Sequence, residues 1–380
     1  MSDNKTCSTK KNQIVKLGDI LEVLTDYHSN GSYKTLKENV TLLEQPNFAI
    51  MIRTTNFEKN DFRKNLIYIN QQAYNFLSKS KVLYQDILIN KIANAGAVYF
   101  MPRLDKPVSL GMNLFLLRIK KNYNKYFIFC ILKYNEKRLR LMAKGTTTKT
   151  ITKDNIKMFQ ILLPPLETQQ KIARTLSILD QKIENNHKIN ELLHTLAYKI
   201  YEYYFKYKPK NAKLEQIIIE NPKSSIMVKN AQKTQDKYPF FTSGDNILSY
   251  PKAIIDGRNC FLNTGGNAGI KFYVGKASYS IHTWCICANE FSDYLYLLLS
   301  SIKTHINQSF FQGTSLKHLQ KNLLKKYPIY MPSAHEIKKF NQIIMPLLTL
   351  ISINTRTSKK LEQIRDFLLP LLLKQQVKPK

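Results

Sequence analysis

Two short segments carry the residue types that best suit contact with phosphate groups, and they share one spacing. Gly145-Thr-Thr-Thr-Lys149 recurs as Gly313-Thr-Ser-Leu-Lys317. A flexible glycine followed by hydroxyl donors and a cation can contact phosphate oxygens along a nucleic-acid backbone. The alternative is that the hydroxyls cap a helix, and the two roles are compatible. The candidate phosphate contacts are Thr146, Thr147, Lys149, Thr314, Ser315 and Lys317.

Polar side chains also follow two apolar runs that are typical of β-strands. Arg53-Thr-Thr-Asn56 comes after the first run, and Thr242-Ser-Gly-Asp-Asn246 comes after Tyr238-Pro-Phe-Phe241. Amide and guanidinium groups at a strand end can read base edges, and Asn or Arg can do so with two hydrogen bonds. Ordinary turn chemistry is the alternative for each residue. The candidate DNA contacts of this kind are Arg53, Thr54, Thr55, Asn56, Lys91, Thr242, Ser243, Asn246, Asn263 and Lys271.

The sequence lacks the motifs that mark common catalytic and cofactor sites. It contains no Gly-x-x-x-x-Gly-Lys-Ser/Thr phosphate loop, no His-Glu-x-x-His, no Gly-x-Ser-x-Gly and no Asn/Asp-Pro-Pro-Tyr/Phe of an amino-methyltransferase. Gly265-Gly-Asn-Ala-Gly269 could hold a phosphate, but a hairpin turn is the expectation. The seven His residues show no metal-ligand spacing and the five Cys form no Cys-x-x-Cys pair, so we expect neither a metal site nor a disulfide framework.

The charge balance points to a polyanionic partner. The 380 residues include 58 Lys and Arg against 27 Asp and Glu, a formal net charge of +31. Repulsion of this size disfavours a compact chain unless a binding partner offsets it, and nucleic acid is the leading candidate. A basic membrane-surface protein fits less well, because we find no basic amphipathic helix with a Trp or Phe face. No export signal or membrane span is visible, so we expect a cytoplasmic protein.

The chain is a twofold internal repeat with an offset of 168 residues. The two Gly-Thr segments and the residues after them match without a gap. Beyond each match, apolar residues recur at steps of four and three, which predicts a long helix with a coiled-coil seam. We expect these helices over Leu166–Phe205 and Ala334–Leu373, each about 60 Å long. Pro346 and Pro370 should kink the second helix or fray its end.

Polar residues interrupt the seam of each predicted helix at the same two positions. Asn186 and Asn190 in the first helix are equivalent to Asn354 and Ser358 in the second. Asn186 and Asn354 lie at the helix midpoints, so we expect them to face each other where two antiparallel helices cross at a pseudo-twofold axis and to set the register. Two solvent-facing Asn residues are the alternative. The apolar seam positions are Ile172, Leu176, Leu179, Ile183, Leu193, Leu196, Ile200, Tyr204, Phe340, Ile344, Leu347, Ile351, Leu361, Ile364, Leu368 and Leu372.

Each helix follows a globular block whose interior is unlike that of the other block. Val15–Ile20 resembles Ala212–Ile217, which marks the two block starts. Short apolar runs separated by turn signals such as Asn30-Gly31 predict α/β or α+β blocks. The segment 166–208 holds seven basic against five acidic residues, so the blocks carry most of the positive charge. The predicted strands are Phe48–Arg53, Asp86–Ile92, Asn113–Ile119, Ala253–Ile255, Ile270–Val274 and Ser280–Ala288.

This arrangement resembles the specificity subunit of a type I restriction-modification system. The resemblance rests on the repeat, on Leu163-Pro-Pro-Leu166 and Glu167-Thr-Gln-Gln-Lys171 at the first helix start, and on Tyr238-Pro-Phe-Phe-Thr-Ser-Gly244. It covers nearly the whole chain, although Ser333-Ala-His-Glu336 departs from the first-half pattern. It implies two α/β (α+β) target-recognition domains in a pseudo-twofold arrangement, joined by two long antiparallel coiled-coil-like helices. The target-recognition domains would be residues 1–165 and 209–333, and the spacer helices would be 166–208 and, with the tail, 334–380.

The resemblance also implies a non-catalytic role. Each domain would read one half of a bipartite, asymmetric site in double-stranded DNA, and the helices would dock two methyltransferase (modification) subunits. Those partners would hold S-adenosylmethionine, and restriction (translocase and endonuclease) subunits would use ATP and Mg, so no cofactor is expected in this chain. Two alternatives come from other classes. A fused adenine methyltransferase would bind S-adenosylmethionine itself, and an RNA-binding scaffold would prefer structured RNA to duplex DNA.

Overall fold

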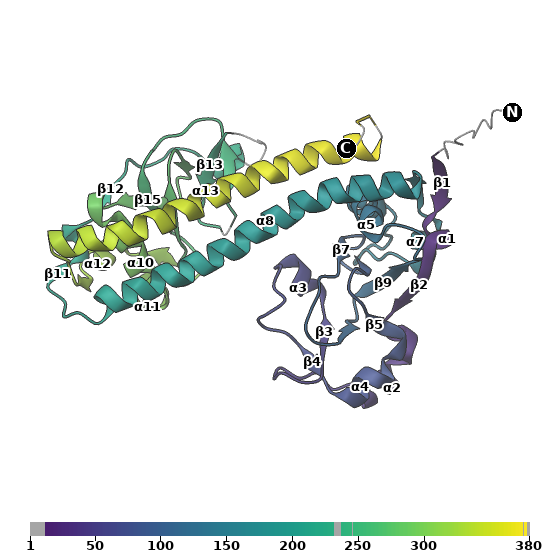
Figure 1. The fold of residues 1–380 in the computed structure, drawn as a ribbon. Coiled ribbons are helices and arrows are strands. Elements are labelled where there is room, and N and C mark those ends of the chain that lie inside the picture. The colour runs from purple at the N-terminus through teal and green to yellow at the C-terminus, as the bar shows by residue number, and fades with distance from the viewer. Residues whose placement is uncertain (1–11, 232–236, 245, 375, 378–380) are drawn as a thin grey trace. The chain divides into compact units, whose positions relative to one another are not determined.

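Figure 1 shows the computed structural model of the chain, which forms two compact units. The first unit comprises residues 1–179 and 365–380, and the second comprises residues 180–364. Two long helices, α8 (Leu166–Tyr201) and α13 (Ala334–Leu373), contribute residues to both units. Mixed sheets and helices together with two long helices confirm the predicted fold class. The structure describes residues 12–231, 237–244, 246–374 and 376–377.

The first unit contains two four-stranded sheets and a two-stranded ribbon. Its elements before α8 are β1 (Gln13–Lys16), α1 (Leu17–Ile20), β2 (Leu21–Asp26), η1 (Tyr27–Asn30), α2 (Tyr33–Asn39), β3 (Ala49–Ile52), α3 (Thr54–Glu58), β4 (Tyr68–Ile69), α4 (Gln71–Phe76), η2 (Ser78–Ser80), β5 (Lys81–Val82), β6 (Ile87–Asn90), β7 (Val98–Phe100), β8 (Val108–Leu110), β9 (Leu114–Ile119), α5 (Lys125–Tyr134), α6 (Glu136–Leu141), α7 (Lys153–Met158) and β10 (Gln160–Leu163). One sheet, in the order β2-β9-β6-β7, is antiparallel. The other, β4-β3-β8-β5, has a parallel pair at β3 and β8, and β1 pairs with β10.

The second unit repeats most of this architecture. Between the long helices it contains η3 (Glu202–Lys206), β11 (Ala212–Lys213), η4 (Leu214–Gln216), β12 (Ile219–Glu220), α9 (Val228–Ala231), β13 (Tyr238–Phe241), β14 (Leu248–Tyr250), β15 (Arg258–Asn263), β16 (Ile270–Val274), β17 (Ser278–Tyr279), β18 (Thr283–Cys287), η5 (Asn289–Phe291), α10 (Ser292–Ser301), α11 (Lys303–Ser309), β19 (Phe311–Gln312), β20 (His318–Leu319), α12 (Lys321–Lys325) and β21 (Pro328–Ile329). Its sheets are β12-β18-β15-β16, β14-β13-β17, β11-β21 and β19-β20.

The strand orders of the two units correspond although their interior sequences differ. The sheet β12-β18-β15-β16 matches β2-β9-β6-β7, and β14-β13-β17 matches β4-β3-β8, including the parallel pair. Strand β5 has no counterpart in the second of these sheets. The repeat seen in sequence at the helices and Gly-Thr segments therefore extends, at the level of topology, through both blocks.

Most of the predicted strands are present because their apolar runs are buried. Strands β6 and β9 are almost fully buried, which suits a continuous apolar run rather than an alternating one. Each predicted strand contains an observed strand except Ala253–Ile255, where that prediction is wrong. Only Ile255 pairs there, in an isolated bridge to Ala277. Gly257 follows with φ +94°, and the resulting turn stops the strand from extending.

The two long helices begin with different polar contacts. At the start of α8, the buried Gln169 donates to the Pro164 carbonyl at 2.8 Å and accepts from the Asn124 N–H at 3.1 Å. At α13, the Glu336 carboxylate accepts from the Ser333 N–H at 2.9 Å and the Ser333 hydroxyl accepts from the Glu336 N–H at 3.3 Å. The Ser333 N–H and the Tyr330 hydroxyl, which both donate to the Glu336 carboxylate, lower the pKa of Glu336 to about 2. The departure of this segment from the first-half pattern is thus a reciprocal helix cap.

The helix predictions are largely confirmed. Helix α13 has the predicted bounds and continues through Pro346 and Pro370, while α8 ends at Tyr201 and a π-helical turn follows it. Two predicted seam positions are wrong: Leu196 and its repeat equivalent Ile364 are 49% and 44% exposed. Ala197 is buried in place of Leu196. A straight helix drifts about 20° per heptad from a 3.5-residue repeat. Positions counted at regular steps of four and three therefore move off the buried face after several turns.

The polar seam residues pair across the helices, but not as predicted. The Asn186 amide donates to the Ser358 hydroxyl at 3.2 Å, and the Asn354 amide donates to the Asn190 side-chain oxygen at 2.9 Å. Asn186 and Asn354 are therefore not direct partners. Asn186 contacts Ser358, which is the repeat equivalent of Asn190, and Asn354 contacts Asn190 itself. The pseudo-twofold axis of the helix pair therefore passes between the two polar seam positions of each helix. The pairing also shows that the helices are antiparallel.

A buried carboxylate, that of Asp26, links the sheet β2-β9-β6-β7 of the first unit to α7. Asp26, at the end of β2, accepts from the Lys91 ammonium at 2.7 Å, the Lys153 ammonium at 3.0 Å and the Ser29 hydroxyl at 2.7 Å. Burial acts to raise the pKa of Asp26, but these hydrogen bonds hold it well below its usual range. A carboxyl with a lowered pKa in the folded state stabilises the fold above its unfolded-state pKa and loses that contribution as the pH falls.

Asp26→Asn should lower the free energy of unfolding of the first unit by about 2–4 kcal/mol, because two ammonium groups lose their counter-charge. The difference from wild type should shrink below about pH 4, where the wild-type carboxyl also becomes protonated on unfolding. Urea denaturation followed by far-UV circular dichroism measures it. Trp284 is the single tryptophan and lies in the second unit. The urea midpoint of unfolding that is followed by its fluorescence should be the same in the variant and the wild type. An equal effect of Asp105→Asn, at an exposed carboxyl, would contradict this account.

Asn190→Leu should lower the free energy of unfolding of the second unit by about 1–2 kcal/mol, because it leaves the Asn354 amide without its acceptor. The double change Asn190→Leu, Asn354→Leu should recover most of that loss. Trp284 fluorescence during urea denaturation reports it, with Asn185→Leu, at an exposed neighbouring position, as the control. Simple additivity of the two single changes would show that the amides are not coupled.

Candidate nucleic-acid interface

The two Gly-Thr segments form matching exposed hairpin loops. In the first unit a bridge between Lys144 and Thr150 closes the loop, and in the second unit β19 and β20 close it. Gly145 and Gly313 have φ of +132° and +142°, and a Cβ on either would lie 2.3 or 2.4 Å from a carbonyl oxygen across the loop. Only glycine fits this turn. We call these loops the Gly-Thr hairpins, and the predicted hydroxyl and Lys residues within them are all exposed.

The helix-cap alternative does not account for these hydroxyls. Thr152, outside the hairpin, caps α7 by accepting from the Asn155 N–H at 3.2 Å. At α12 the N-cap position is Gln320, which makes no side-chain cap hydrogen bond. The hydroxyls of Thr146, Thr147 and their counterparts therefore stand in exposed loops, where they suit contact with a ligand.

Each Gly-Thr hairpin is held through its backbone against a connection between two strands of the sheet, from β6 to β7 in the first unit and from β15 to β16 in the second. The Lys149 carbonyl accepts from the Ala93 N–H at 3.1 Å, and the Lys317 carbonyl accepts from the Gly266 N–H at 2.9 Å. In the reverse direction, the Lys91 carbonyl accepts from the Ile151 N–H at 3.1 Å, and the Thr264 carbonyl accepts from the Leu319 N–H at 3.0 Å. The same pair of backbone hydrogen bonds thus fixes the position of the Gly-Thr hairpin in both units.

A third segment completes this end of each unit. The loop from β8 to β9 donates from Gly111 N–H to the Ile52 carbonyl at 2.9 Å, and its Asn113 carbonyl accepts from Lys91 N–H at 2.8 Å. The loop from β17 to β18 makes the equivalent bonds at 2.9 and 3.3 Å. In each unit the Gly-Thr hairpin, the β6–β7 or β15–β16 connection and this loop meet at one end. We call this end the reading end of the unit.

Sequence reasoning missed the loop between β8 and β9 and its counterpart. Met112 and Asn113 are exposed at its tip in the first unit, and His282 is exposed at the equivalent place in the second. A short signal was present: Gly111-Met-Asn113 separates two apolar runs, as Ser280-Ile-His282 does in the second block. An apolar side chain beside an amide is suited to a thymine methyl group and an adenine edge.

The segment after β3 is mainly a helix start. The Asn56 side-chain oxygen accepts from the Arg53 N–H at 2.9 Å, and its amide donates to the Asp61 carbonyl at 3.3 Å. Asn56 is buried, so the turn alternative describes it and its prediction as a base reader is wrong. The Arg53 guanidinium donates to the Asn65 carbonyl at 3.4 Å, while Thr55 is exposed and Thr54 half-buried.

Several other predicted contacts support the reading ends from within. The Lys91 ammonium is paired with Asp26, as described above. The Lys271 ammonium donates to the Thr242 carbonyl at 2.9 Å and to the Asn263 side-chain oxygen at 3.3 Å. Ser243 donates to the His282 carbonyl. These groups are half-buried, and their side chains hold loop backbones or a neighbouring carboxylate within the fold. Their contact with DNA stays a prediction.

The expected hairpin turn at residues 265–269 is confirmed. It connects β15 to β16, and Gly266 has φ +79°. Two N–H groups of the turn have partners within the fold: Gly266 donates to the Lys317 carbonyl and Ala268 donates to the Asn307 side chain at 2.8 Å. The turn thus supports the Gly-Thr hairpin of the second unit.

The exposed candidates differ between the units outside the Gly-Thr hairpins. The connection from β3 to β4 contains α3 and the exposed pair Arg63 and Lys64, which sequence reasoning did not select, although two adjacent basic residues were a signal. The shorter connection from β13 to β14 presents Asn246. The predicted contacts that remain exposed are Thr55, Thr146, Thr147, Lys149, Asn246, Thr314, Ser315 and Lys317.

The described part of the chain contains no group of three or more His, Cys, Asp or Glu placed to hold a metal ion. Its helices include none that is both long and apolar enough to cross a membrane. Together with a net charge of +31, the exposed hydroxyl, amide and basic side chains at two matching reading ends define a protein that recognises nucleic acid.

The chain belongs to the type I restriction-modification DNA specificity domain family, whose model matches residues 9–195 and 210–363. It is 25% identical to the putative type I restriction enzyme MjaX specificity subunit of Methanocaldococcus jannaschii, across 97% of this chain and 94% of that protein. It is also 25% identical to the MjaIX specificity subunit of the same organism, across 62% of this chain and 64% of that protein. The crystal structure of the S subunit from M. genitalium has the same fold, with a TM-score of 0.62 at 16% identity and 97% of each chain covered. The resemblance found in the sequence is confirmed, and DNA recognition is the role of this subunit class.

Lys149→Ala and Lys317→Ala should each weaken DNA binding by a similar factor for all sequences and reduce the slope of log affinity against log salt by about one unit. The reason is that each exposed ammonium would release one counterion from a phosphate. Titration of labelled duplexes across a salt series measures the slope, and Lys199→Ala, at an exposed position on α8, should leave it unchanged. Loss of discrimination at one base pair with an unchanged slope would instead make that lysine a base reader.

Proposed function

We propose that this chain reads a bipartite, asymmetric site in double-stranded DNA, with one half-site for each unit. The observation that carries the proposal is that two reading ends share one backbone framework but differ in the side chains they expose. Met112 and Asn113 in the first unit correspond to Ile281 and His282 in the second. Different side chains on the same framework suit different base sequences, so the two half-sites should differ.

The two kinds of exposed residue suit two kinds of DNA contact. The Gly-Thr hairpins offer hydroxyl groups and one ammonium each, which suit phosphate oxygens and carry little sequence information. The loop tips and the connections after β3 and β13 offer Asn, His and Arg side chains, which suit base edges in the major groove. Affinity would therefore come mainly from the hairpins and discrimination mainly from the tips.

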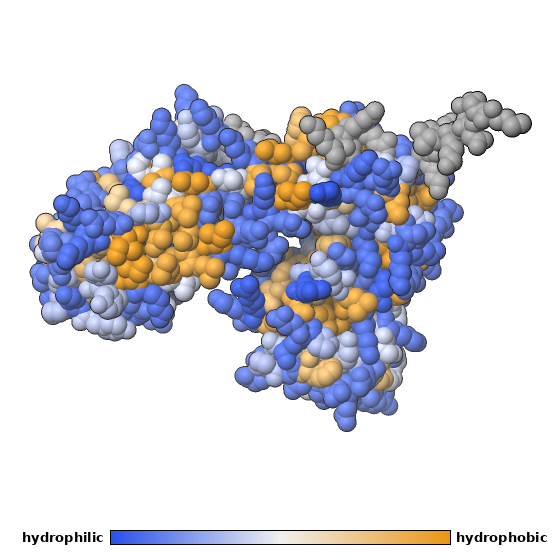
Figure 2. All heavy atoms as spheres, in the orientation of Figure 1, coloured by the Kyte–Doolittle hydropathy of each residue, from blue (hydrophilic) through white to orange (hydrophobic). Residues whose placement is uncertain are grey.

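The long helices are proposed to serve as the spacer and as the docking surface for two methyltransferase (modification) subunits and for restriction subunits. Figure 2 shows apolar side chains gathered along the second-unit part of α8. The exposed residues there include Ile189, Leu192 and Leu196, which recur at steps of three and four and so share one helix face. Exposed apolar stripes of this kind mark protein interaction sites.

The proposed division of labour leaves the chemistry to the partners. Methyltransferase subunits would supply S-adenosylmethionine and modify adenine, and restriction subunits would supply ATP-driven translocation and cleavage with Mg. This chain would select the site, in the cytoplasm, without a cofactor of its own. Binding of S-adenosylmethionine to the purified chain alone, measured by calorimetry, would overturn this division.

Genome-wide mapping of methylated adenines, in cells with and without this chain, should show methylation that depends on the chain at two different short half-sites separated by an unread spacer. Replacing residues 20–145 by the block of another specificity subunit should change one half-site only. Replacing residues 214–313 is the matched control and should change the other. A continuous or palindromic recognition sequence would contradict the proposal.

A further inference from the structure

One face of helix α13 makes polar contacts with the recognition block of the second unit. The residues that make these contacts are spaced by three or four positions, so they lie on a single face of the helix. This face is distinct from the seam that packs against α8. Its members are Asn341, Met345, Thr349, Ser352, Arg356 and Lys359.

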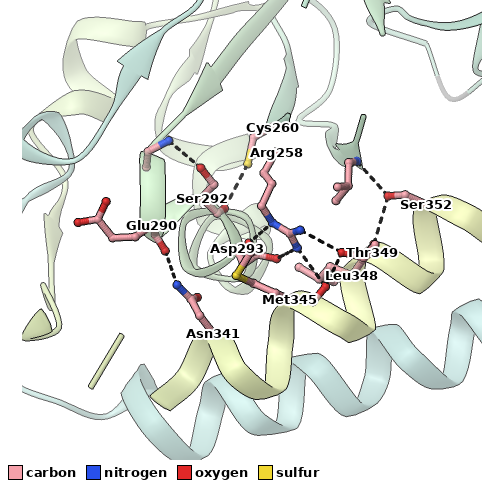
Figure 3. Close-up of polar contacts among 12 residues, drawn as sticks. Arg258, Cys260, Glu290, Ser292, Asp293, Asn341, Met345, Leu348, Thr349 and Ser352 are labelled. Atoms are coloured by element: carbon pink, nitrogen blue, oxygen red, sulfur yellow. Dashed lines mark hydrogen bonds and ion pairs between the residues drawn. The ribbon is translucent and has the colours of Figure 1, made fainter. Parts of the chain in front are cut away.

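The centre of this face contacts a half-buried arginine of the block, Arg258, drawn in Figure 3. Arg258, the first residue of β15, donates twice to the Asp293 carboxylate of α10, at 2.5 Å in each contact. The same guanidinium donates to the Thr349 hydroxyl at 3.0 Å and to the Met345 carbonyl at 3.2 Å. Asp293 is almost fully buried. One guanidinium thus joins a strand, a helix of the block and α13.

Two further hydrogen bonds flank this centre and are also visible in Figure 3. The Ser352 hydroxyl accepts from the Val274 N–H at the end of β16 at 3.0 Å, and the Asn341 amide donates to the Glu290 carbonyl at 2.7 Å. Beyond them, the Arg356 guanidinium lies 5.7 Å from the centre of the Tyr273 ring. We call the contacts of Asn341, Thr349, Ser352 and Arg356 with the block, together with Arg258, the α13 clamp.

The same face of α13 also contacts the connection from β13 to β14. The Lys359 ammonium donates to the Ile247 carbonyl at 3.3 Å, and Ile247 lies in the connection from β13 to β14, next to the exposed Asn246. The α13 clamp is therefore continuous, along one helix face, with a segment that the proposed function assigns to base contact.

Apolar packing between α13 and the block would not by itself define their relative position. The buried apolar residues of α13 are Phe340 and several aliphatic residues, among them Ile337, Ile344, Leu348 and Ile351, which are similar to one another in size and shape. After a small rotation or slip of the helix, one aliphatic contact can replace another. Hydrogen bonds at 2.5–3.2 Å are directional, so the same movement breaks them. The polar contacts therefore define the orientation of the block on the helix.

The clamp residues are also not part of the repeat. The first-half equivalents of Thr349 and Ser352 are Gln181 and Glu184. The sequence outside the clamp matches over the Gly-Thr segments and the helix seams, but it differs here. The clamp is thus particular to the second unit, as expected if its contacts serve that block's own surface.

We infer that the α13 clamp determines spacer specificity: by holding the second reading end at one orientation on α13, it restricts the number of base pairs between half-sites that the protein accepts. This inference rests on the proposed bipartite function. The Arg258 network acts as a positioning device and touches no base. Loosening it should widen the accepted range of spacer lengths while the base preference within each half-site stays the same.

The test uses the full chain assembled with its methyltransferase subunits and duplexes that hold both mapped half-sites at the natural spacing and at one base pair more or less. The variant is Thr349→Val with Ser352→Ala, which removes hydroxyl partners but keeps the Arg258–Asp293 pair and the side-chain volume. The ratio of affinities for natural and altered spacing should fall roughly three- to tenfold, as expected for the loss of two hydrogen bonds. Gln181→Ala with Glu184→Ala, at the exposed repeat-equivalent positions, should leave the ratio at the wild-type value.

Arg356→Ala is a second variant, at an exposed residue, that keeps the inference testable if the first fails to fold. It should lower the same ratio. A wild-type ratio in the variants, with folding shown by an unchanged Trp284 fluorescence spectrum, would overturn the clamp inference alone. A change in half-site base preference equal to the change in spacing preference would overturn it as well, since the network would then shape the reading surface. Equal wild-type affinity for every spacing would overturn the bipartite function itself, and the inference with it.

Discussion

Both reading ends depend on hydrogen bonds between backbone atoms. The carbonyls of Lys149 and Lys317 accept from the β6–β7 and β15–β16 connections, and each bond requires a hairpin that only glycine can close. These hairpin bonds use backbone atoms only, so the exposed side chains of the hairpins and loop tips can differ without breaking them. The same bonds therefore recur in two blocks whose interior sequences are dissimilar. This shared framework also separates the contacts that suit phosphates, which recur in both units, from those that suit bases, which do not.

The long helices combine apolar packing with a few directional polar contacts. Apolar packing supplies most of the stabilisation, since residues such as Phe340 and Ile344 are fully buried. It does not select one register, and the polar pairs do so. Asn190 with Asn354, and Asn186 with Ser358, align the two helices, while Arg258 aligns the block on α13. Each of these polar groups would lose its partner if the elements slipped, which is why a small number of them suffices.

Buried charge in this protein serves position more than attraction to DNA. The chain is strongly basic, yet Lys91 is occupied by Asp26 inside the fold, and Lys271 is occupied by loop oxygens. The lysines of the Gly-Thr hairpins are exposed, and so they are available to a polyanion. Net charge therefore indicates the class of ligand, but it does not identify which cations meet that ligand.

Local sequence determined the parts of this protein that depend on periodicity and on turn chemistry. The long helices, the strands with buried apolar runs, the glycine hairpins and the twofold repeat all follow from spacing along the chain, because helices, strands and tight turns are governed by neighbouring residues. The subunit class followed from the same repeated pattern. Only the tertiary structure decided what each polar side chain does. Asn56, Lys91 and Asn263 have the residue types of base readers. Asn56 and Asn263 are buried, and the half-buried Lys91 is paired with Asp26, which is distant in sequence. Asn186 pairs with Ser358 and not with Asn354, because the position of the axis depends on the packing of two whole helices, which no single spacing encodes.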